Sequence, residues 1–283
     1  MNKNHFKLGL IQMNATNMVA ENMDSVVEMI TQAADRGAEL VMTPENTTLM
    51  EFDRKTLLAK TFYEEEDPSL PRFSALARER GLWLLIGSMP IKLRGDTGKL
   101  VNRSYLFSPE GKIVARYDKI HMFDVDLPDG QSYRESASFQ AGEHAVIASL
   151  PWGKLGLSIC YDLRFGALYR SLAQNGAEMI SVPAAFTRVT GEAHWHVLLR
   201  ARAIECGAFV FAPAQVGQHF NVHGECRETF GHSLIIDPWG NILDDGGNKS
   251  GVSVAEIDLS LVQKARRQIP SLSHDRNFSV TDK

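Results

Sequence analysis

Three side chains that can take part in acyl transfer each follow an apolar run. Cys160 comes after "LGLSI", Glu45 after "LVMTP", and Lys119 after "KIVARYD". A thiol can act as a nucleophile, and a nearby lysine favours its thiolate. A carboxylate can move the thiol proton, and a cation can stabilise the oxyanion that forms on an attacked carbonyl. Together the three residue types indicate acyl transfer, although each taken singly also fits a core cysteine, a solvated carboxylate or a surface lysine.

The elements that must position these residues alternate between predicted strands and helices. Helices are predicted over residues 21–37, 71–80, 165–176, 192–205 and 259–269. Strands are predicted over 6–13, 38–44, 82–89, 177–183, 208–214 and 252–258, with one strand ending at Leu150, one ending at Cys160, and hairpins over 101–119 and 232–245. The ends of several strands commonly converge on one crevice of a sheet protein, so Glu45, Lys119 and Cys160 are expected to meet.

An internal echo indicates a duplicated architecture. The sequence "RGAELVMTP" at 36–44 and the sequence "NGAEMISVP" at 175–183 carry Gly, Ala, Glu and Pro at equal offsets, each after a predicted helix. Two such units, interleaved with hairpins, predict an α/β protein with helices outside its sheets. No linker divides the chain, so we expect a single domain over 1–283. The irregular stretch 121–144 is predicted to be a long functional loop.

Composition narrows the class of protein. The 283 residues carry a net charge of −4 without a basic run, which argues against nucleic-acid binding. No segment approaches the roughly 20 apolar residues of a membrane helix, and the N-terminal apolar stretch is too short for a signal peptide. Three cysteines without close spacing argue against a disulfide framework. We therefore expect a cytoplasmic protein without membrane contact.

The motifs around the three candidate residues resemble those of the nitrilase superfamily of carbon–nitrogen hydrolases. They are "TPENT", "YDKIHMFD" and "GLSICYDLRF", and they occur in the family's order. The resemblance implies a four-layer αββα sandwich, no metal or organic cofactor, and a homodimer or larger homo-oligomer. It also implies that Cys160 is the nucleophile, Glu45 the general base and Lys119 the oxyanion stabiliser. Glu135, in "RESASF", matches a second glutamate that related amidases place near the catalytic lysine.

The segments "VPAAFTRVTGEAHWHVLLRARAIE" and "GHSLIIDPWG" resemble the branch of deaminated glutathione amidases and omega-amidases. That resemblance implies hydrolysis of the terminal amide of a small 2-oxo acid amide, most closely deaminated glutathione, through a cysteine thioester with release of ammonia. The alternatives are 2-oxoglutaramate, 2-oxosuccinamate, an N-carbamoyl compound or an aliphatic amide. For the anionic substrate, Arg164 is the predicted carboxylate ligand and Phe186 and Thr187 the predicted pocket wall. The N–H of Tyr161 is the predicted second oxyanion donor.

Other chemistries compete with this interpretation. The stretch "HFNVHGECRETFGH" suits zinc by residue type, with His219, His223, Cys226 and His232, but it lacks a familiar ligand spacing and is expected to be a loop near the pocket. The two histidines of "HWH" at 194–196 point to different sides of a helix and make a poor chelate. A cysteine–histidine peptidase would not need Glu45 and Lys119. An acyltransferase would use the same three residues, and only its products would distinguish it.

Overall fold

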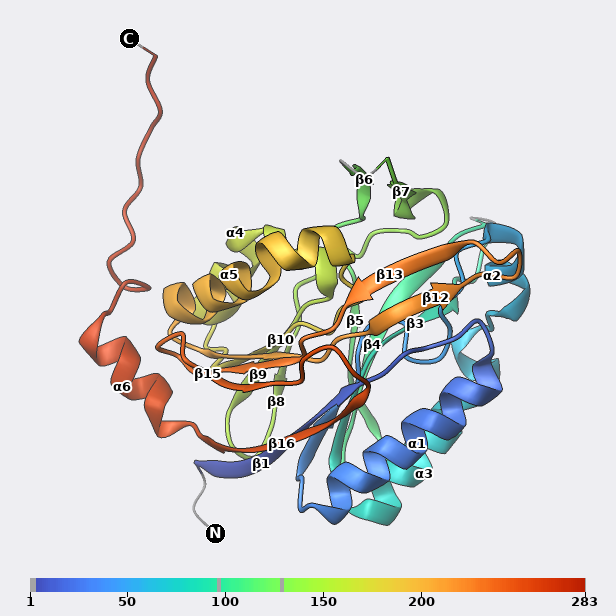
Figure 1. The fold of residues 1–283 in the computed structure, drawn as a ribbon. Helices are drawn as coiled ribbons and strands as arrows, with labels where there is room; N and C mark the ends of the chain where they lie inside the picture. Colours follow the sequence, from blue (N-terminus) through green and yellow to red (C-terminus); the bar gives the residue numbers. More distant parts are fainter. Residues whose placement is uncertain (1–3, 96–97, 128–129, 283) are drawn as a thin grey trace.

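Two six-stranded sheets pack face to face between two layers of helices (Figure 1). This arrangement is seen in a computed structural model, which describes residues 4–95, 98–127 and 130–282. The four layers run α, β, β, α, as the resemblance to the nitrilase superfamily implied. Helices α1 and α3 cover the outer face of the first sheet, while α4 and α5 cover the outer face of the second.

The first sheet has the strand order β16-β1-β2-β3-β4-β5. Its strands are β1 (His5–Gln12), β2 (Leu40–Met42), β3 (Trp83–Lys92), β4 (Leu100–Phe107), β5 (Ile113–Asp118) and β16 (Gly251–Asp258). The second sheet has the order β15-β14-β11-β10-β9-β8. Its strands are β8 (Ile147–Ser149), β9 (Lys154–Leu157), β10 (Met179–Ser181), β11 (Phe209–Ala212), β14 (Leu234–Ile236) and β15 (Ile242–Asp245).

The two sheets repeat one topology. Each sheet has three neighbouring parallel strands, which are β1, β2 and β3 in the first sheet and β9, β10 and β11 in the second. Beside the third of these strands lie two antiparallel strands, which are β4 and β5 or β14 and β15. Beside the first lies one antiparallel strand, which is β16 or β8. The two echoing sequences end in β2 and β10, which are the middle strands of the two parallel sets. The echo therefore marks equivalent positions of a duplicated unit.

The helices are α1 (Val19–Asp35), α2 (Arg54–Lys60), α3 (Ser69–Arg80), α4 (Gly166–Gln174), α5 (Arg188–Cys206) and α6 (Ser260–Gln268). Two further hairpins lie outside the main sheets, formed by β6 (Asp124–Asp126) with β7 (Ser132–Arg134) and by β12 (Val216–Phe220) with β13 (Cys226–Phe230). The sequence analysis missed α2, which has only seven residues. It also treated the β12–β13 hairpin as a loop, and this expectation was wrong.

The core explains why the central strands are apolar on both sides. Alternate residues of the first sheet, such as Leu40 and Leu85, pack toward the second sheet. The residues between them, such as Val41 and Leu84, pack toward α1 and α3. Strands covered on both faces have no solvent face for polar residues, so their sequences read as continuous apolar runs.

The two halves of the molecule meet closely where their parallel strands end. Gly87 in β3 faces the carbonyls of Thr43 and Pro44 and the ring of Pro183, and a Cβ at this glycine would collide with all three. Pro44 and Pro183 are the equivalent prolines of the two echoing sequences. The glycine therefore allows the ends of β2 and β10 to approach each other, and the candidate residues follow directly from these ends.

Candidate active site

Cys160 begins a short 3₁₀ helix just beyond the second sheet. Strand β9 ends at Leu157, so the expectation that this strand runs to the cysteine was wrong, and the helix spans Cys160–Arg164. The backbone of Cys160 has a φ of +49°, and its N–H donates to the carbonyl oxygen of Pro183 at 2.9 Å. A non-glycine residue in this left-handed region carries strain, which such structures maintain mostly at functional sites. Cys160 is 7% exposed and lines a cavity.

Glu45 follows β2 and is held by donors on both carboxylate oxygens. Its Oε1 accepts hydrogen bonds from Lys119 Nζ at 3.0 Å and from Asn102 Nδ2 at 2.9 Å. Its Oε2 accepts from the backbone N–H of Ala185 at 2.8 Å. The side chain is almost fully buried, so these donors replace the water that a carboxylate would otherwise bind. The carboxylate is therefore fixed in one orientation.

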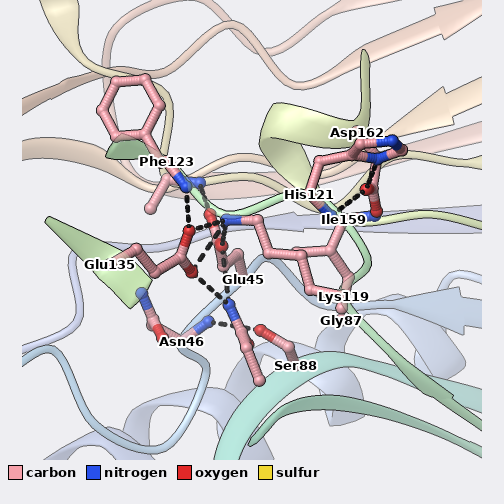
Figure 2. Close-up of polar contacts among 12 residues, drawn as sticks. Glu45, Asn46, Gly87, Ser88, Lys119, His121, Phe123, Glu135, Ile159 and Asp162 are labelled. Carbon is pink, nitrogen blue, oxygen red and sulfur yellow. Dashed lines mark hydrogen bonds and ion pairs between the residues drawn. The ribbon is translucent and has the colours of Figure 1, made fainter. Parts of the chain in front are cut away.

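Lys119 lies one residue beyond β5, and its ammonium reaches between two glutamates (Figure 2). Besides Glu45, it contacts Glu135 Oε1 at 3.0 Å and Glu135 Oε2 at 2.9 Å. Glu135 is fixed in turn by the N–H of Phe123, which donates to its Oε2 at 2.7 Å. Glu135 was predicted to act beside the catalytic lysine, and the structure places it there.

The charges of this cluster set the protonation states. Burial on its own would lower the pKa of Lys119, but the carboxylates of Glu135 and Glu45 outweigh it and raise that pKa well above its ordinary value. The lysine is therefore a permanent cation. Burial, reinforced by the charge of Glu45, raises the pKa of the Cys160 thiol well above its ordinary value. Cys160 is therefore a protonated thiol near neutral pH, and it would need a base to act as a nucleophile.

The raised thiol pKa predicts a pH-dependent stability. Above about pH 8.5 the unfolded chain releases the Cys160 proton, whereas the folded protein keeps it. The folded state is thus penalised by about 1.4 kcal/mol for each further pH unit until the folded pKa is reached. We expect the free energy of unfolding of the wild type to fall more steeply between pH 8.5 and 10 than that of Cys160→Ala. Urea unfolding of both proteins measures the difference.

Comparing the wild type with Cys160→Ala removes the contribution of the other buried thiol, Cys206, to the pH dependence of stability. Burial raises the pKa of Cys206 to about 12, and this group contributes the same slope to both proteins. Parallel pH profiles for the wild type and Cys160→Ala would contradict the raised pKa of Cys160.

Asn102 joins the two glutamates. Its Nδ2 donates to Glu45 Oε1 at 2.9 Å and to Glu135 Oε1 at 3.4 Å. The residue lies in β4, and its side chain is 2% exposed. Asn102 is followed in β4 by two further polar residues, Arg103 and Ser104, so the sequence carried no clear signal for this contact.

Asp162 ties the segment that carries Lys119 to the segment that carries Cys160 (Figure 2). Its carboxylate accepts from the N–H of Ile159 at 2.9 Å, from the N–H of His121 at 3.0 Å and from the hydroxyl of Tyr117 at 2.6 Å. A ring nitrogen of His121 lies 2.7 Å from the same carboxylate. Ile159 precedes the cysteine and His121 follows the lysine by two residues, so one buried carboxylate fixes both backbones.

A single cavity contains the cluster and most of the predicted substrate-binding residues. Glu45, Lys119, Glu135 and Cys160 line it, as do the predicted residues Tyr161, Phe186 and Thr187. Phe123 and Tyr133, both from the predicted long loop 121–144, form part of its wall. These aromatic residues and Asn102 were missed by the sequence analysis.

Arg164 has a different position from the one expected. It is absent from the described lining of the cavity. Its guanidinium lies 5.8 Å from the ring of Tyr161 and 5.5 Å from that of Phe186, and it contacts His194 Nδ1 at 3.3 Å. The guanidinium therefore packs on two residues of the cavity wall, Tyr161 and Phe186. Its role as a carboxylate ligand stays a prediction.

Three histidines that could bind a metal lie at two separate places. His219 lines the cavity, where its ring nitrogens contact the carbonyl of Ala15 at 2.7 Å and the hydroxyl of Thr229 at 2.8 Å. Elsewhere, His196, His232 and Asp245 bring three potential ligand atoms within 4.8 Å of one another. This is a different set from the four metal-ligand candidates considered in the sequence. Each imidazole already contacts the Asp245 carboxylate, which accounts for the cluster without an ion.

The arrangement can perform nucleophilic acyl transfer. A thiol, a carboxylate and a permanent cation meet in one cavity, and the cation is backed by a second carboxylate. The carboxylate can remove the thiol proton, and the ammonium can stabilise negative charge on an attacked oxygen.

Comparison with known proteins agrees with this chemistry. Residues 7–267 match the family model described as carbon–nitrogen hydrolase. A deaminated glutathione amidase from Synechocystis sp. is 43% identical, over 93% of this chain and 96% of that protein. Another from Yersinia enterocolitica is 42% identical, over 96% of this chain and 93% of that protein. The crystal structure of the C. elegans NitFhit protein superposes with a TM-score of 0.88 at 33% identity, covering 98% of this chain and 66% of that one.

Proposed function

Since the chain belongs to the carbon–nitrogen hydrolase family, we propose that it is an amidase whose substrate is deaminated glutathione. The observation that carries the proposal is the cavity in which Cys160, Glu45 and Lys119 meet, in a chain that is 42–43% identical to proteins named deaminated glutathione amidase. Similarity of this extent over nearly the whole chain supports the same class of substrate.

In the first half of the proposed reaction, Cys160 forms a thioester with the substrate. Glu45 accepts the thiol proton as the sulfur attacks the amide carbonyl, and the ammonium of Lys119 stabilises the oxyanion. The N–H of Tyr161, which follows the nucleophile directly, is the proposed second donor. Glu45 then returns the proton to the departing nitrogen, the C–N bond breaks, and the amine leaves.

In the second half, water hydrolyses the thioester. Glu45 takes a proton from the water as it attacks the acyl carbon, and Lys119 again stabilises the oxyanion. The C–S bond breaks, the sulfur regains its proton from Glu45, and a carboxylic acid leaves. Splitting the reaction into two steps replaces one difficult displacement with two easier ones.

The leaving group distinguishes the candidate substrates. Deaminated glutathione carries cysteinylglycine on the amide nitrogen, so its hydrolysis releases cysteinylglycine and 2-oxoglutarate. A primary amide such as 2-oxoglutaramate releases ammonia and the same 2-oxoglutarate. The release of ammonia expected from the sequence therefore applies to a primary amide only.

The test offers both substrates to purified protein, with the Cys160→Ala variant as the blank, and follows 2-oxoglutarate, ammonia and cysteinylglycine. We expect kcat/KM for deaminated glutathione to exceed that for 2-oxoglutaramate by at least about tenfold, a ratio that 1.4 kcal/mol of extra transition-state binding to the cysteinylglycine part supplies. The reverse preference would make the protein an omega-amidase. Turnover of neither substrate would overturn the proposal.

Assembly and location are part of the proposal. We propose a homodimer or larger homo-oligomer, supported by the exposed apolar side chains of Val197 and Ile204 on α5 and of Trp239 and Leu243 in the neighbouring hairpin. Light scattering of the purified protein measures the oligomeric state. All three cysteines are free, which supports a cytoplasmic location. No helix among the described residues is long and apolar enough to cross a membrane.

A further inference from the structure

The proposed substrate is an anion, and the cavity must therefore supply a cation that is free to bind it. The cationic side chains in the described lining are Lys119, Arg134 and Arg227. Lys119 is held between Glu45 and Glu135, and its position suits the reacting oxygen. Arg134 is exposed and its guanidinium already pairs with Asp126 at 2.8 Å. These two cations are thus already engaged.

Arg227 differs from the other two. It lies in β13, and its guanidinium packs 4.2 Å from the ring centroid of Phe52 and 4.5 Å from that of Tyr133. Among the described residues, no carboxylate forms an ion pair with it and no side chain or carbonyl accepts a hydrogen bond from it. Burial lowers its pKa below the ordinary value, as expected for a cation that has lost water without gaining a partner.

The neighbouring carboxylates have other partners. Glu228 lines the same cavity but pairs with Arg188, whose guanidinium lies 3.2 Å away. Glu51 also lines the cavity, and its Oε1 accepts the N–H groups of Phe52 and Asp53 at 2.9 and 2.8 Å. The ammonium of Lys60 lies 3.9 Å from its other oxygen. Neither carboxylate therefore neutralises Arg227 directly.

Three separate segments build this position. Arg227 comes from the β12–β13 hairpin, Phe52 from the residues before α2, and Tyr133 from the long loop, and Figure 1 shows the hairpin extending toward α2. Stacking on aromatic rings uses the faces of a guanidinium and leaves its in-plane N–H groups available. Those N–H groups match the two oxygens of a carboxylate.

We infer that Arg227 is the carboxylate-binding residue of the cavity and that it holds a carboxylate of the substrate through its guanidinium. This inference rests on the proposed function, because it names the contact that selects an anionic amide for the same cavity. Deaminated glutathione has two carboxylates, one on the 2-oxo acyl part and one on the glycine of the leaving group, whereas 2-oxoglutaramate has only the first.

The experiment measures KM and kcat of Arg227→Gln and Arg227→Lys with both substrates. Loss of a charge-assisted contact should raise KM about 10- to 100-fold in Arg227→Gln, with kcat within about threefold of wild type. Lysine should restore only part of the affinity, because an ammonium lacks the planar fork. If KM of Arg227→Gln rises for both substrates, Arg227 binds the carboxylate of the acyl part. If KM rises for deaminated glutathione alone, Arg227 binds the glycine carboxylate.

Two further variants make the comparison specific. Arg36→Gln removes the same charge from a surface site where, among the described residues, the guanidinium donates to the carbonyl of Val252 alone, and it should leave KM unchanged. Arg164→Gln tests the arginine predicted from the sequence. A larger rise of KM in Arg164→Gln than in Arg227→Gln, or an unchanged KM in Arg227→Gln, would overturn the inference.

A binding measurement separates this inference from the proposed function. Iodoacetamide, which is uncharged, alkylates Cys160, and 2-oxoglutarate is used as the protecting anion. We expect 2-oxoglutarate to protect Cys160 in the wild type, and the concentration needed to rise at least tenfold in Arg227→Gln, whether or not either amide is turned over. Serylglycine, which carries the glycine carboxylate without a second thiol, tests the other carboxylate in the same way. Equal protection of both proteins by each anion, or no protection of the wild type by either, would overturn the anion site even if the wild type hydrolyses deaminated glutathione.

Discussion

Replacing Cys160 with alanine is expected to reduce kcat by at least about 10⁴-fold while the folded structure is retained. The reaction proceeds through a bond to the Cys160 sulfur, and alanine offers no atom to form it. The substitution keeps the Cβ and the strained backbone, and it removes one buried sulfur atom, so the free energy of unfolding at pH 7 should change by no more than about 1 kcal/mol. Steady-state assays and urea unfolding of the same preparation measure both effects.

Cys206 provides the matched control for this prediction. It is also fully buried, but it is the last residue of α5 and lies outside the described lining of the cavity. Cys206→Ala should lose a similar or larger amount of stability and keep its turnover. Substantial turnover by Cys160→Ala, or equal losses of activity in both variants, would show that the sulfur of Cys160 is not the nucleophile.

The meeting of Glu45, Lys119 and Cys160 could be predicted because each follows a predicted strand, whereas their proposed roles came from the family resemblance. Glu45 follows β2 and Lys119 follows β5, and both strands have clear apolar patterns bounded by turn residues. The end of β9 was less well predicted, since the apolar residues Leu157 and Ile159 continue the pattern past the point where the strand ends. Periodicity reports burial, and a buried 3₁₀ turn gives the same signal as a buried strand.

The contacts between distant segments could not be predicted in the same way. Asp162 accepts the N–H of His121, which lies 41 positions away in the sequence, and Asn102 donates to Glu45, which lies 57 positions away. Arg227 lies in a hairpin with few buried apolar residues, and its two aromatic neighbours come from a short segment and from an irregular loop. Nothing in the local pattern around these residues encodes such pairings, which depend on tertiary packing.

The position of Arg164 relative to the cavity could not be predicted from its distance to Cys160 in the sequence. It follows the nucleophile by four residues, which suggested a position in the pocket. The 3₁₀ helix that begins at Cys160 turns the chain away, and the arginine packs behind Tyr161 and Phe186 beside α5. In this position the guanidinium contacts two residues of the cavity wall, and its role as a carboxylate ligand stays a prediction.

The prediction for Glu45→Gln separates proton transfer from the other effects of this carboxylate. The amide of glutamine cannot accept the thiol proton, and loss of a general base typically reduces the rate 10²- to 10⁴-fold. We therefore expect kcat to fall by about 10³-fold. Mass spectrometry of the variant incubated with substrate should also detect any thioester that accumulates, because Glu45 activates the water of the second step.

Glu135→Gln is the matched comparison. Glu135 binds Lys119 with both oxygens and accepts the N–H of Phe123, and it is proposed to position the lysine rather than to accept the thiol proton. The same loss of one negative charge beside the same lysine should therefore reduce kcat less than Glu45→Gln does. A greater loss in Glu135→Gln would assign the base role to the other carboxylate.

The reactivity of the thiol provides the decisive second readout for Glu45→Gln. The charge of Glu45 contributes to the raised pKa of Cys160, so its removal should lower that pKa and leave the sulfur as reactive as before, or more so, toward iodoacetamide. Slow turnover with unimpaired alkylation would mean that the nucleophile is intact and that only its proton acceptor is missing. Loss of both turnover and alkylation would instead mean that the substitution displaces Cys160. Such a displacement is expected if the contacts of Glu45 with Asn102, Lys119 and Ala185 hold the ends of neighbouring strands together. Wild-type kcat in this variant would remove Glu45 from the base role.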